Sequence, residues 1–205
     1  MIKSLAECAA VLALPPLDHD APIRGFEIDS RRIQPGMCFL ALDLARSGVM
    51  FVEDAIRNGA VAVITSQPLA LSIPHLVVDD VEQAMLQLMH HVATCSQAKK
   101  YAITGSMGKT TSKNALTHVL SQIGSTHATT GNLNNHFGVP VTLLNIQPKH
   151  EYVVIEMGAN QPGDIAQLVE YAKPDVVVIT NAAPCHLEKL HSIEGVIQEK
   201  GSIAG

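Results

Sequence analysis

Short runs of apolar and β-branched residues alternate along the chain with segments in which apolar residues recur every three or four positions. Runs of the first kind predict strands, and segments of the second kind predict amphipathic helices. This alternation is typical of a parallel sheet whose strands are joined by crossover helices, so we expect an α/β fold. The expected strands are Val61–Thr65, Leu76–Val78, Tyr101–Thr104, Tyr152–Glu156 and Val176–Thr180.

The clearest helical pattern separates two parts of the chain. Before this pattern the segments are short and contain the turn pairs Pro15-Pro16 and Pro35-Gly36, and after it the strand and helix patterns alternate regularly. We therefore expect a domain boundary near residue 80, with a small N-terminal α/β domain at residues 1–80 and a parallel-sheet domain at residues 81–205. The apolar face of the helix consists of Val81, Ala84, Met85, Leu88, Val92 and Cys95.

Composition narrows the class of protein. The chain has 205 residues, of which 47% are hydrophobic, and this is enough to bury a substantial core. Its net charge is −5 with acidic and basic residues interspersed, so we expect no nucleic-acid partner. The four cysteines form no C-x-x-C pair, which favours free thiols in a reducing compartment. No apolar run approaches the roughly 18 residues of a membrane span, and we expect a cytoplasmic protein without membrane insertion.

A glycine turn joins the expected strand Tyr101–Thr104 to a helix that begins at Lys109. Apolar residues continue the helix pattern to Ile123, and Gly124 is expected to end the helix. Unpaired amides and the positive end of the helix dipole make such a helix start an anion site.

The segment T-G-S-M-G-K-T-T has the residues of a phosphate loop for ATP. In such loops glycines let the amides approach phosphate oxygens, the lysine balances their charge, and the next hydroxyl reaches Mg²⁺. The match is to a short form of the motif, because Ile103 stands where the full Walker pattern has its first glycine. The expected ATP-binding residues here are Gly105, Ser106, Met107, Gly108, Lys109, Thr110 and Thr111.

Two later strands also end in polar residues. Glu156 ends one expected strand, and Asn181 follows another, with His186 five residues further on. Ligands of open parallel sheets bind beyond the carboxyl ends of the strands, so these residues and the phosphate loop should share one edge. A carboxylate there can hold Mg²⁺, whereas an imidazole is not a ligand that Mg²⁺ prefers. Taken singly, Glu156 could be a capping or solvated acid and His186 an ordinary loop histidine.

Four sequence blocks follow one another along the chain. They are the phosphate loop, T-G-N-L-N-N from Thr130 with Gly138-Val139-Pro140, E-M-G-A-N from Glu156 with Pro162-Gly163, and Asn181–Pro184 with His186-Leu187-Glu188. In this order the blocks resemble the Mur ligase family, and the resemblance covers nearly the whole chain. The segment Asp29-Ser30-Arg31, followed by Pro35-Gly36 and Phe39, resembles the UDP-binding region of that family.

The resemblance implies a monomeric, ATP-dependent and ADP-forming amide ligase of peptidoglycan precursor synthesis. Its substrates would be UDP-N-acetylmuramoyl-tripeptide, bound by residues 1–80, and D-alanyl-D-alanine, joined through an acyl phosphate. By this resemblance Lys109 stabilises the transferred phosphate, Thr110 and Glu156 hold one Mg²⁺, and His186 holds a second. Nucleotide contacts would come from Asn134, Asn135 and Asn181, and substrate contacts from Asp29, Ser30, Arg31 and Thr130.

Lys200 is a further candidate catalytic residue with two open interpretations. It aligns with a lysine that several family members carry as a carbamate, which would convert a cation that repels Mg²⁺ into an anion that attracts it. The other interpretation is a solvated lysine on the last expected helix.

The sequence departs from the family pattern at three places. The family usually has Asp-Gly-His where this chain has Ser47-Gly48-Val49. An acidic or amide residue is commoner at the position of His136, and a histidine is commoner at the position of Gln161. The chain also ends at Gly205 inside the expected central domain, so we expect a fragment that makes no amide bond by itself.

The alternatives to this ligase are a related ligase with another acid substrate, a nucleotide-binding module and a generic phosphate-loop ATPase. A two-metal edge with Glu156 and His186 would favour a ligase over a binding module.

Overall fold

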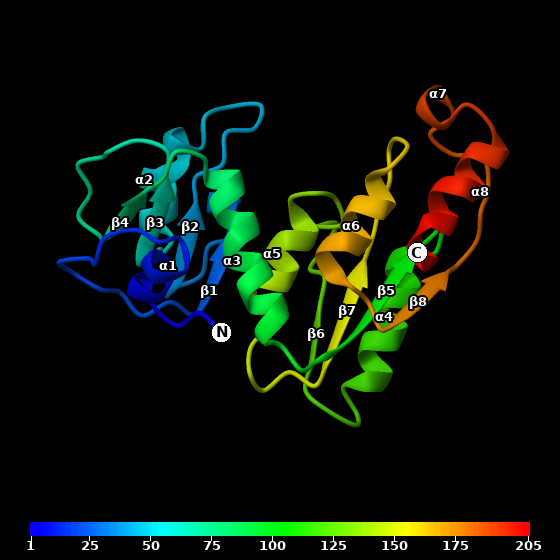
Figure 1. Ribbon diagram of the computed structural model, residues 1–205, viewed down its shortest axis with the longest axis horizontal. Coiled ribbons are helices and arrows are strands. Elements are labelled where there is room, and N and C mark those ends of the chain that lie inside the picture. Colours follow the sequence, from blue (N-terminus) through cyan, green and yellow to red (C-terminus); the bar gives the residue numbers. More distant parts are fainter. The chain divides into compact units, whose positions relative to one another are not determined.

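The computed structural model describes all residues from 1 to 205, which form two compact units, Met1–Cys95 and Ser96–Gly205. Each unit is built on a four-stranded sheet, and every pair of neighbouring strands is parallel (Figure 1). The expected α/β fold is therefore confirmed. No helix has the length and apolar character needed to cross a bilayer.

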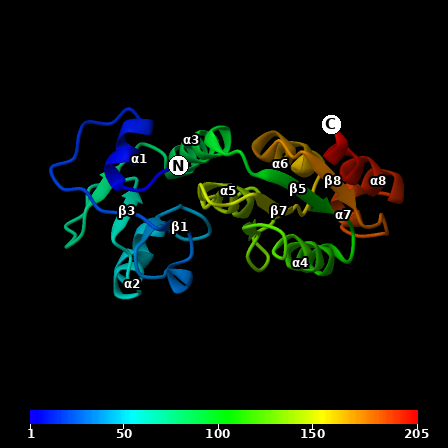
Figure 2. The ribbon, with the colours of Figure 1, turned by 90° about the horizontal axis from the view of Figure 1, so that it is seen from below.

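The first unit has its strands in sequence order, β1-β2-β3-β4. One face of this sheet carries α1 and α3, and the other carries α2 (Figure 2). Phe39 and Val63 lie at the centre of a core that packs the sheet against α2. The elements are α1 (Leu5–Val11), β1 (Gly25–Glu27), a 3₁₀ turn (Ser30–Arg32), β2 (Met37–Leu40), a second 3₁₀ turn (Gly48–Phe51), α2 (Val52–Arg57), β3 (Ala62–Thr65), β4 (His75–Val77) and α3 (Val81–Cys95).

The expected amphipathic helix is α3, and it begins and ends at Val81 and Cys95, the first and last residues of the expected apolar face. Its apolar face is buried and α3 packs against α1, so the helix belongs to the first unit. The compact units consequently divide between Cys95 and Ser96, one helix later than the change of pattern near residue 80.

The second unit has the strand order β6-β7-β5-β8, with β5 between β7 and β8. One face of the sheet carries α4, and α6 and α8 lie over the other (Figure 2). Because all the strands are parallel, the segments that follow them begin at the same edge. The elements are β5 (Lys99–Thr104), α4 (Lys109–Leu120), β6 (Thr126–Ala128), α5 (Gly138–Leu144), β7 (Tyr152–Glu156), α6 (Asp164–Ala172), β8 (Val176–Ile179), α7 (Leu187–Leu190), α8 (Ile193–Gly201) and a 3₁₀ turn (Ser202–Ala204).

The five expected strands are present with small shifts at their ends, but the end of α4 corrects the sequence pattern. The helix ends at Leu120, because the carbonyls of Val119 and Leu120 accept hydrogen bonds from Gln122, Ile123 and Gly124 in a tight turn. The side chains of Val119 and Ile123 are 60% and 66% exposed. The expectation that the helix continues to Ile123 was therefore wrong, and the buried residues of α4 are Lys113 and Leu120.

Candidate nucleotide-binding site

The glycine turn between β5 and α4 has a backbone that only glycine adopts readily. Gly105 and Gly108 have φ angles of 148° and 79°, in the left-handed region. A Cβ atom on Gly105 would also lie 2.0 Å from Oγ1 of Thr180. The turn can therefore pack against the segment after β8 only because residue 105 lacks a side chain.

The start of α4 carries a set of free hydrogen-bond donors. The backbone amides of residues 108–111 have no acceptor within the chain, and no side chain caps the helix. Nζ of Lys109 donates to the carbonyl of Gly105 at 2.6 Å and to that of Ser106 at 3.4 Å, so it bonds only to neutral groups. Free amides, the helix dipole and an ammonium group together form a site for a phosphate-sized anion.

The segment after β8 holds the turn in place. The side chain of Asn181 accepts from the amide of Met107 at 3.0 Å and donates to the carbonyl of Met107 at 3.1 Å. Oγ1 of Thr180 also donates to the carbonyl of Met107, at 2.6 Å. Oγ of Ser106 donates to the carbonyl of Ala183 at 2.8 Å. Asn181 and Ser106 thus support the loop, and the supporting role of Thr180 was not expected from the sequence.

Glu156 ends β7, next to the phosphate loop in the sheet, and it has one free oxygen. The residue is only 2% exposed, and Oε1 accepts from Nδ2 of Asn134 at 2.8 Å. Oε2 is buried without a hydrogen-bond partner. A buried carboxylate oxygen with free lone pairs is a suitable ligand for a hard cation such as Mg²⁺, so Glu156 fits the metal that the sequence predicts.

The other two expected metal ligands lie in different surroundings. Thr110 is exposed in the first turn of α4. His186 lies at the start of α7 with a φ of 50°, and its Nδ1 is 3.8 Å from Oε1 of Glu188. No hydrogen bond joins His186 to Glu156, and the chain contains no group of three or more His, Cys, Asp or Glu side chains that could hold a metal.

Lys200 on α8 is buried, so its interpretation as a solvated lysine is wrong. Its side chain belongs to a residue only 2% exposed, and its ammonium has no hydrogen-bond or ion-pair partner. Burial, and then the positive charge of Lys109, lower the pKa of Lys200 below its usual value of 10.5. Because the charge of Lys109 affects the pKa of Lys200, the two ammonium groups belong to the same electrostatic environment.

Glu199, the neighbour of Lys200, fastens α8 to the start of α6. Its two carboxylate oxygens accept from the amides of Gly163 and Ile165, both at 2.8 Å. Glu199 is 5% exposed. No sequence pattern predicts this contact, because an acidic residue on a helix usually faces solvent.

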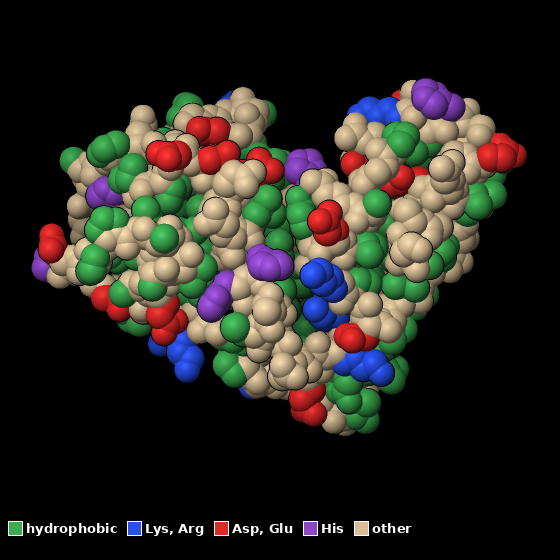
Figure 3. Space-filling view, in the orientation of Figure 1, with side chains coloured by type: hydrophobic (Ala, Val, Ile, Leu, Met, Phe, Trp, Pro, Cys, Tyr) green, Lys and Arg blue, Asp and Glu red, His purple; other side chains and the backbone are tan.

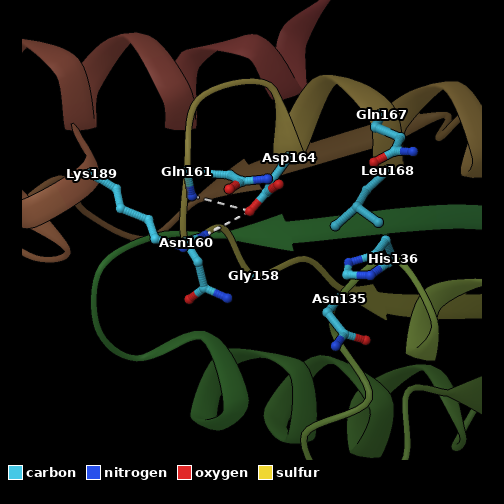
Figure 4. A pocket seen from close by; sticks show the side chains of 9 residues that line it. All are labelled: Asn135, His136, Gly158, Asn160, Gln161, Asp164, Gln167, Leu168 and Lys189. Atoms are coloured by element: carbon cyan, nitrogen blue, oxygen red, sulfur yellow. Dashed lines mark hydrogen bonds between the residues drawn. The ribbon is translucent and has the colours of Figure 1, made fainter. Parts of the chain in front are cut away.

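A pocket of about 160 Å³ lies beside this edge (Figure 4). The two substituted positions His136 and Gln161 both line it, and Lys189 extends into it from α7. Oδ2 of Asp164 accepts from the amides of Asn160 and Gln161 at 2.8 and 3.1 Å. The remaining lining residues are Asn135, Gly158, Gln167 and Leu168.

In the first unit, the expected substrate residues mainly contact one another. Asp29 accepts from Nε of Arg31 at 2.9 Å and from Nη2 at 2.7 Å, and these hydrogen bonds lower the pKa of the Asp29 carboxyl. The Arg31 side chain is 86% exposed and can reach a ligand. Ser30 is buried, and its carbonyl accepts from Nδ2 of Asn58 at 2.9 Å. Thr130, the expected substrate residue of the second unit, is exposed after β6.

The substituted segment Ser47-Gly48-Val49 closes a loop after β2. Oδ1 of Asp43 accepts from Oγ of Ser47 at 2.7 Å and from the amide of Gly48 at 2.9 Å. A Cβ atom on Gly48 would lie 2.2 Å from the carbonyl carbon of Ala41. This loop therefore retains a carboxylate, but the carboxylate is engaged within the loop.

The surface of the molecule agrees with a locally held anion. On the visible face several acidic side chains gather over the first unit, and Lys and Arg form no extended area (Figure 3). The net charge is −5. Binding of a polyphosphate would therefore depend on the amides and ammonium groups of the site and not on a general positive field.

Comparisons with known proteins agree with this arrangement. Residues 103–205, half of the chain, match the Mur ligase middle domain. The chain is 40% identical over 185 residues to a UDP-N-acetylmuramoyl-tripeptide--D-alanyl-D-alanine ligase of Escherichia coli, covering 90% of this chain and 41% of the relative. It is 34% identical over 211 residues to the ligase of the same name from Haemophilus influenzae, covering 99% and 46%.

Solved structures give the same result. MurF from Acinetobacter baumannii superimposes with a TM-score of 0.79 at 33% identity, over 97% of this chain and 45% of that protein. MurF ligase from Thermotoga maritima in complex with ADP gives a TM-score of 0.70 at 33% identity, over 88% and 42%. The chain spans less than half the length of these relatives. The matches in sequence and in fold, with MurF proteins among the relatives, establish that the chain belongs to the Mur ligase family.

Proposed function

We propose that the protein is an ATP-dependent, ADP-forming ligase of the MurF type. It would join D-alanyl-D-alanine to UDP-N-acetylmuramoyl-tripeptide in peptidoglycan precursor synthesis, in the cytoplasm and as a monomer. The observation that carries the proposal is the phosphate loop, where the free amides of residues 108–111 and the Lys109 ammonium lie one strand away from the free carboxylate oxygen of Glu156. The relatives that bear this name support the choice of substrates.

The amides of residues 108–111 and Lys109 would bind the phosphates of ATP. Lys109 now donates to neutral carbonyls, and a phosphate oxygen is a stronger acceptor for an ammonium group. The ammonium would therefore turn toward the γ-phosphate, where it stabilises the charge that develops during transfer. Ser106, Met107 and Asn181 would keep the loop in its binding geometry.

Thr110 and Glu156 are the residues that would hold Mg²⁺, and Asn134 orients the Glu156 carboxylate through Oε1. When bound, Mg²⁺ neutralises charge on the phosphate oxygens of the nucleotide. His186 remains the proposed ligand of a second ion, although an imidazole suits Mg²⁺ less well than oxygen does. Asn135 and Thr111 would be further polar contacts to the nucleotide.

The proposed reaction has two steps, phosphoryl transfer to the carboxylate and then formation of the amide bond. The terminal carboxylate of the tripeptide attacks the γ-phosphorus, the bond to the β,γ-bridging oxygen breaks, and ADP leaves. The amine of D-alanyl-D-alanine then attacks the acyl carbon, inorganic phosphate leaves, and the nitrogen loses its proton. The first step is needed because a carboxylate is a poor acyl donor until phosphate provides a leaving group.

Lys200 would act as a carbamate. Carbamate formation requires the neutral amine, which attacks CO₂ and loses a proton, and the lowered pKa of Lys200 favours that form. The resulting anion would face the positive charge of Lys109 without a competing partner. Burial of Lys200 and the absence of any hydrogen bond to its ammonium support this assignment.

The first unit would bind the UDP end of the substrate. Arg31 is the exposed cation of the segment and would exchange its half-buried partner Asp29 for a phosphate oxygen. Ser30 would contribute through its backbone, since its side chain is buried. Thr130 would contact the substrate from the second unit.

The test is ADP formation by the intact natural protein. We expect ADP release and a condensed product of the correct mass only when UDP-N-acetylmuramoyl-tripeptide and D-alanyl-D-alanine are both present. A panel of carboxylic acids without UDP serves as the comparison. Equal ADP formation with those acids would indicate a ligase with another substrate, and nucleotide binding without any product would indicate a binding module.

A further inference from the structure

Lys113 is a buried lysine that the proposed chemistry does not use. It lies on α4 one turn after Lys109 and is 5% exposed. Its ammonium donates to the carbonyl of Thr129 at 2.9 Å, and no carboxylate forms an ion pair with it. Burying a charge on a single neutral acceptor is unfavourable, so the position of Lys113 calls for a compensating role.

Thr129 connects Lys113 with Glu156. Its carbonyl accepts from Lys113, and its Oγ1 accepts from the amide of Glu156 at 3.0 Å. Its own amide donates to the carbonyl of Val154 at 3.0 Å, and the residue is 2% exposed. Thr129 is thus held by three bonds, one of which comes from the phosphate-loop helix and one from the residue whose carboxylate has a free oxygen.

The segment that begins at Thr129 returns to the same carboxylate. Asn134 donates from Nδ2 to Oε1 of Glu156 at 2.8 Å, and its carbonyl accepts from the amide of Gly158 at 2.8 Å. Residues 129–134 therefore contact Glu156 at its backbone and at its side chain. Only Oε2 is left for a ligand.

We propose that Lys113 is a positioning residue that fixes Glu156, through Thr129, for the divalent cation of the bound nucleotide. This inference rests on the proposed function, because it assigns Glu156 to that cation. Lys113 lies on the helix whose first turn binds phosphate, so one rigid element places both the anion site and the metal ligand.

The contrasting possibility is a tether that stabilises the fold and does nothing for the cation. The two roles differ in what they change. A tether affects unfolding, whereas a residue that orients a metal ligand affects the metal requirement, and loss of such a residue typically lowers metal affinity by about 10-fold or more.

The test uses the intact protein with Lys113→Met, which keeps the length of the side chain and removes its charge and donors. The readouts are the Mg²⁺ concentration that half-saturates binding of a fluorescent ATP analogue, and Mn²⁺ binding followed by electron paramagnetic resonance. We expect the half-saturating Mg²⁺ concentration to rise about 10-fold, with weaker Mn²⁺ binding. Lys149→Met, at an exposed lysine of the same unit, is the control and should change neither value.

A second variant covers the case in which Lys113→Met does not fold. Thr129→Val removes the acceptor of the Glu156 amide and keeps the shape of the side chain and the carbonyl that Lys113 contacts. It should raise the Mg²⁺ requirement in the same direction. A normal requirement in the folded variants would overturn the role of Lys113 alone, whereas failure of the unmodified protein to bind the ATP analogue would overturn the proposed function as well.

Discussion

The edges of the two sheets differ in how their charged groups are satisfied. At the second edge, formed by the segments after β5, β6, β7 and β8, Oε2 of Glu156 is buried without a hydrogen-bond partner, and the buried residue Lys200 forms no ion pair. At the first edge, formed by residues 28–48, Asp29 pairs with Arg31, and Asp43 accepts from Ser47 and Gly48. Both edges carry motif residues, but only the second keeps charged atoms free and fixed in place.

This difference indicates two kinds of binding site. Preorganised groups stabilise developing charge most effectively, and at the second edge the amides of residues 108–111 and Oε2 of Glu156 are already free, so chemistry is expected there. At the first edge a ligand must replace internal hydrogen bonds, and the net gain from such an exchange is small. The first edge is therefore suited to holding a substrate and not to reacting with it.

The largest expected effect distinguishes a residue that takes part in phosphate transfer from a residue that only binds the substrate. Lys109→Ala in the intact protein should lower kcat by about 100-fold or more, because a charge contact to the transferred phosphate is lost. Arg31→Ala should instead raise KM for the UDP substrate by about 10-fold and leave kcat near normal. Steady-state kinetics of ADP release measure both quantities. A large fall in kcat for Arg31→Ala would break the division between the edges.

The closed packing of the first edge is tested at Gly48. Gly48→Ala should destabilise the first unit by about 2 kcal/mol, because the new Cβ would lie 2.2 Å from a backbone carbon of Ala41. Gly201→Ala, where a Cβ meets nothing within 4 Å, is the matched control and should be neutral or slightly stabilising. Urea unfolding measures the two changes. Normal stability of Gly48→Ala would mean that the loop after β2 is open.

Two capping carboxylates allow a direct comparison. Glu199→Gln should destabilise the second unit by about 1–2 kcal/mol, since one buried amide that bonds to the carboxylate would then face an NH₂ group. Asp29→Asn should change the stability of the first unit by less than about 1 kcal/mol, because its partner Arg31 is 86% exposed. Equal losses of stability in denaturant unfolding would contradict the difference between the two carboxylates.

The smallest expected effect concerns pH. His127 and His150 of the second unit stack with ring centroids 5.1 Å apart, and burial lowers the pKa of both, that of His150 to about 4. Between pH 6.5 and 4 the unfolded chain binds protons that the folded chain does not, so stability falls as the pH falls. The effect should be below about 1 kcal/mol, because His150 is partly exposed.

Hydrogen exchange at pH 7 and pH 5 measures this effect for each unit. The first unit should keep its stability in this range, since the lowered pKa values of Asp29 and Asp43 make their contributions disappear only below about pH 4. His150→Asn, which retains an acceptor for the amide of Gln147, should remove most of the loss in the second unit. Equal loss in both units would argue against the histidine pair.

The fold could be predicted where apolar, β-branched runs mark the strands, as they do in the short strands β3, β4 and β8. Tyr152–Glu156 has the bounds expected from its apolar run. By contrast, the missed strands β1, β2 and β6 contain few β-branched residues. These strands are defined by pairing with their neighbours, which single-sequence patterns do not contain.

Part of the candidate site could be predicted from the order of strands and motifs along the chain. Parallel strands bring their carboxyl ends to one edge, so Lys109, Glu156 and Asn181 were expected together from their order in the chain. The burial of Lys113, Glu199 and Lys200 could not be predicted, because lysine and glutamate on helices normally face solvent. Only the packed structure reveals which charged residues are enclosed.

The contact of Glu199 with α6 also has a consequence for the proposed binding of phosphate at the second edge. Helices α4 and α6 both follow strands that end at this edge, and the start of each helix is by nature attractive to anions. At α6 the protein already supplies an anion of its own, the carboxylate that accepts from Gly163 and Ile165. At α4 the amides of residues 108–111 are vacant. Under the proposed function, the Glu199 carboxylate would repel phosphate from the start of α6 and would leave the start of α4 as the place where phosphate binds.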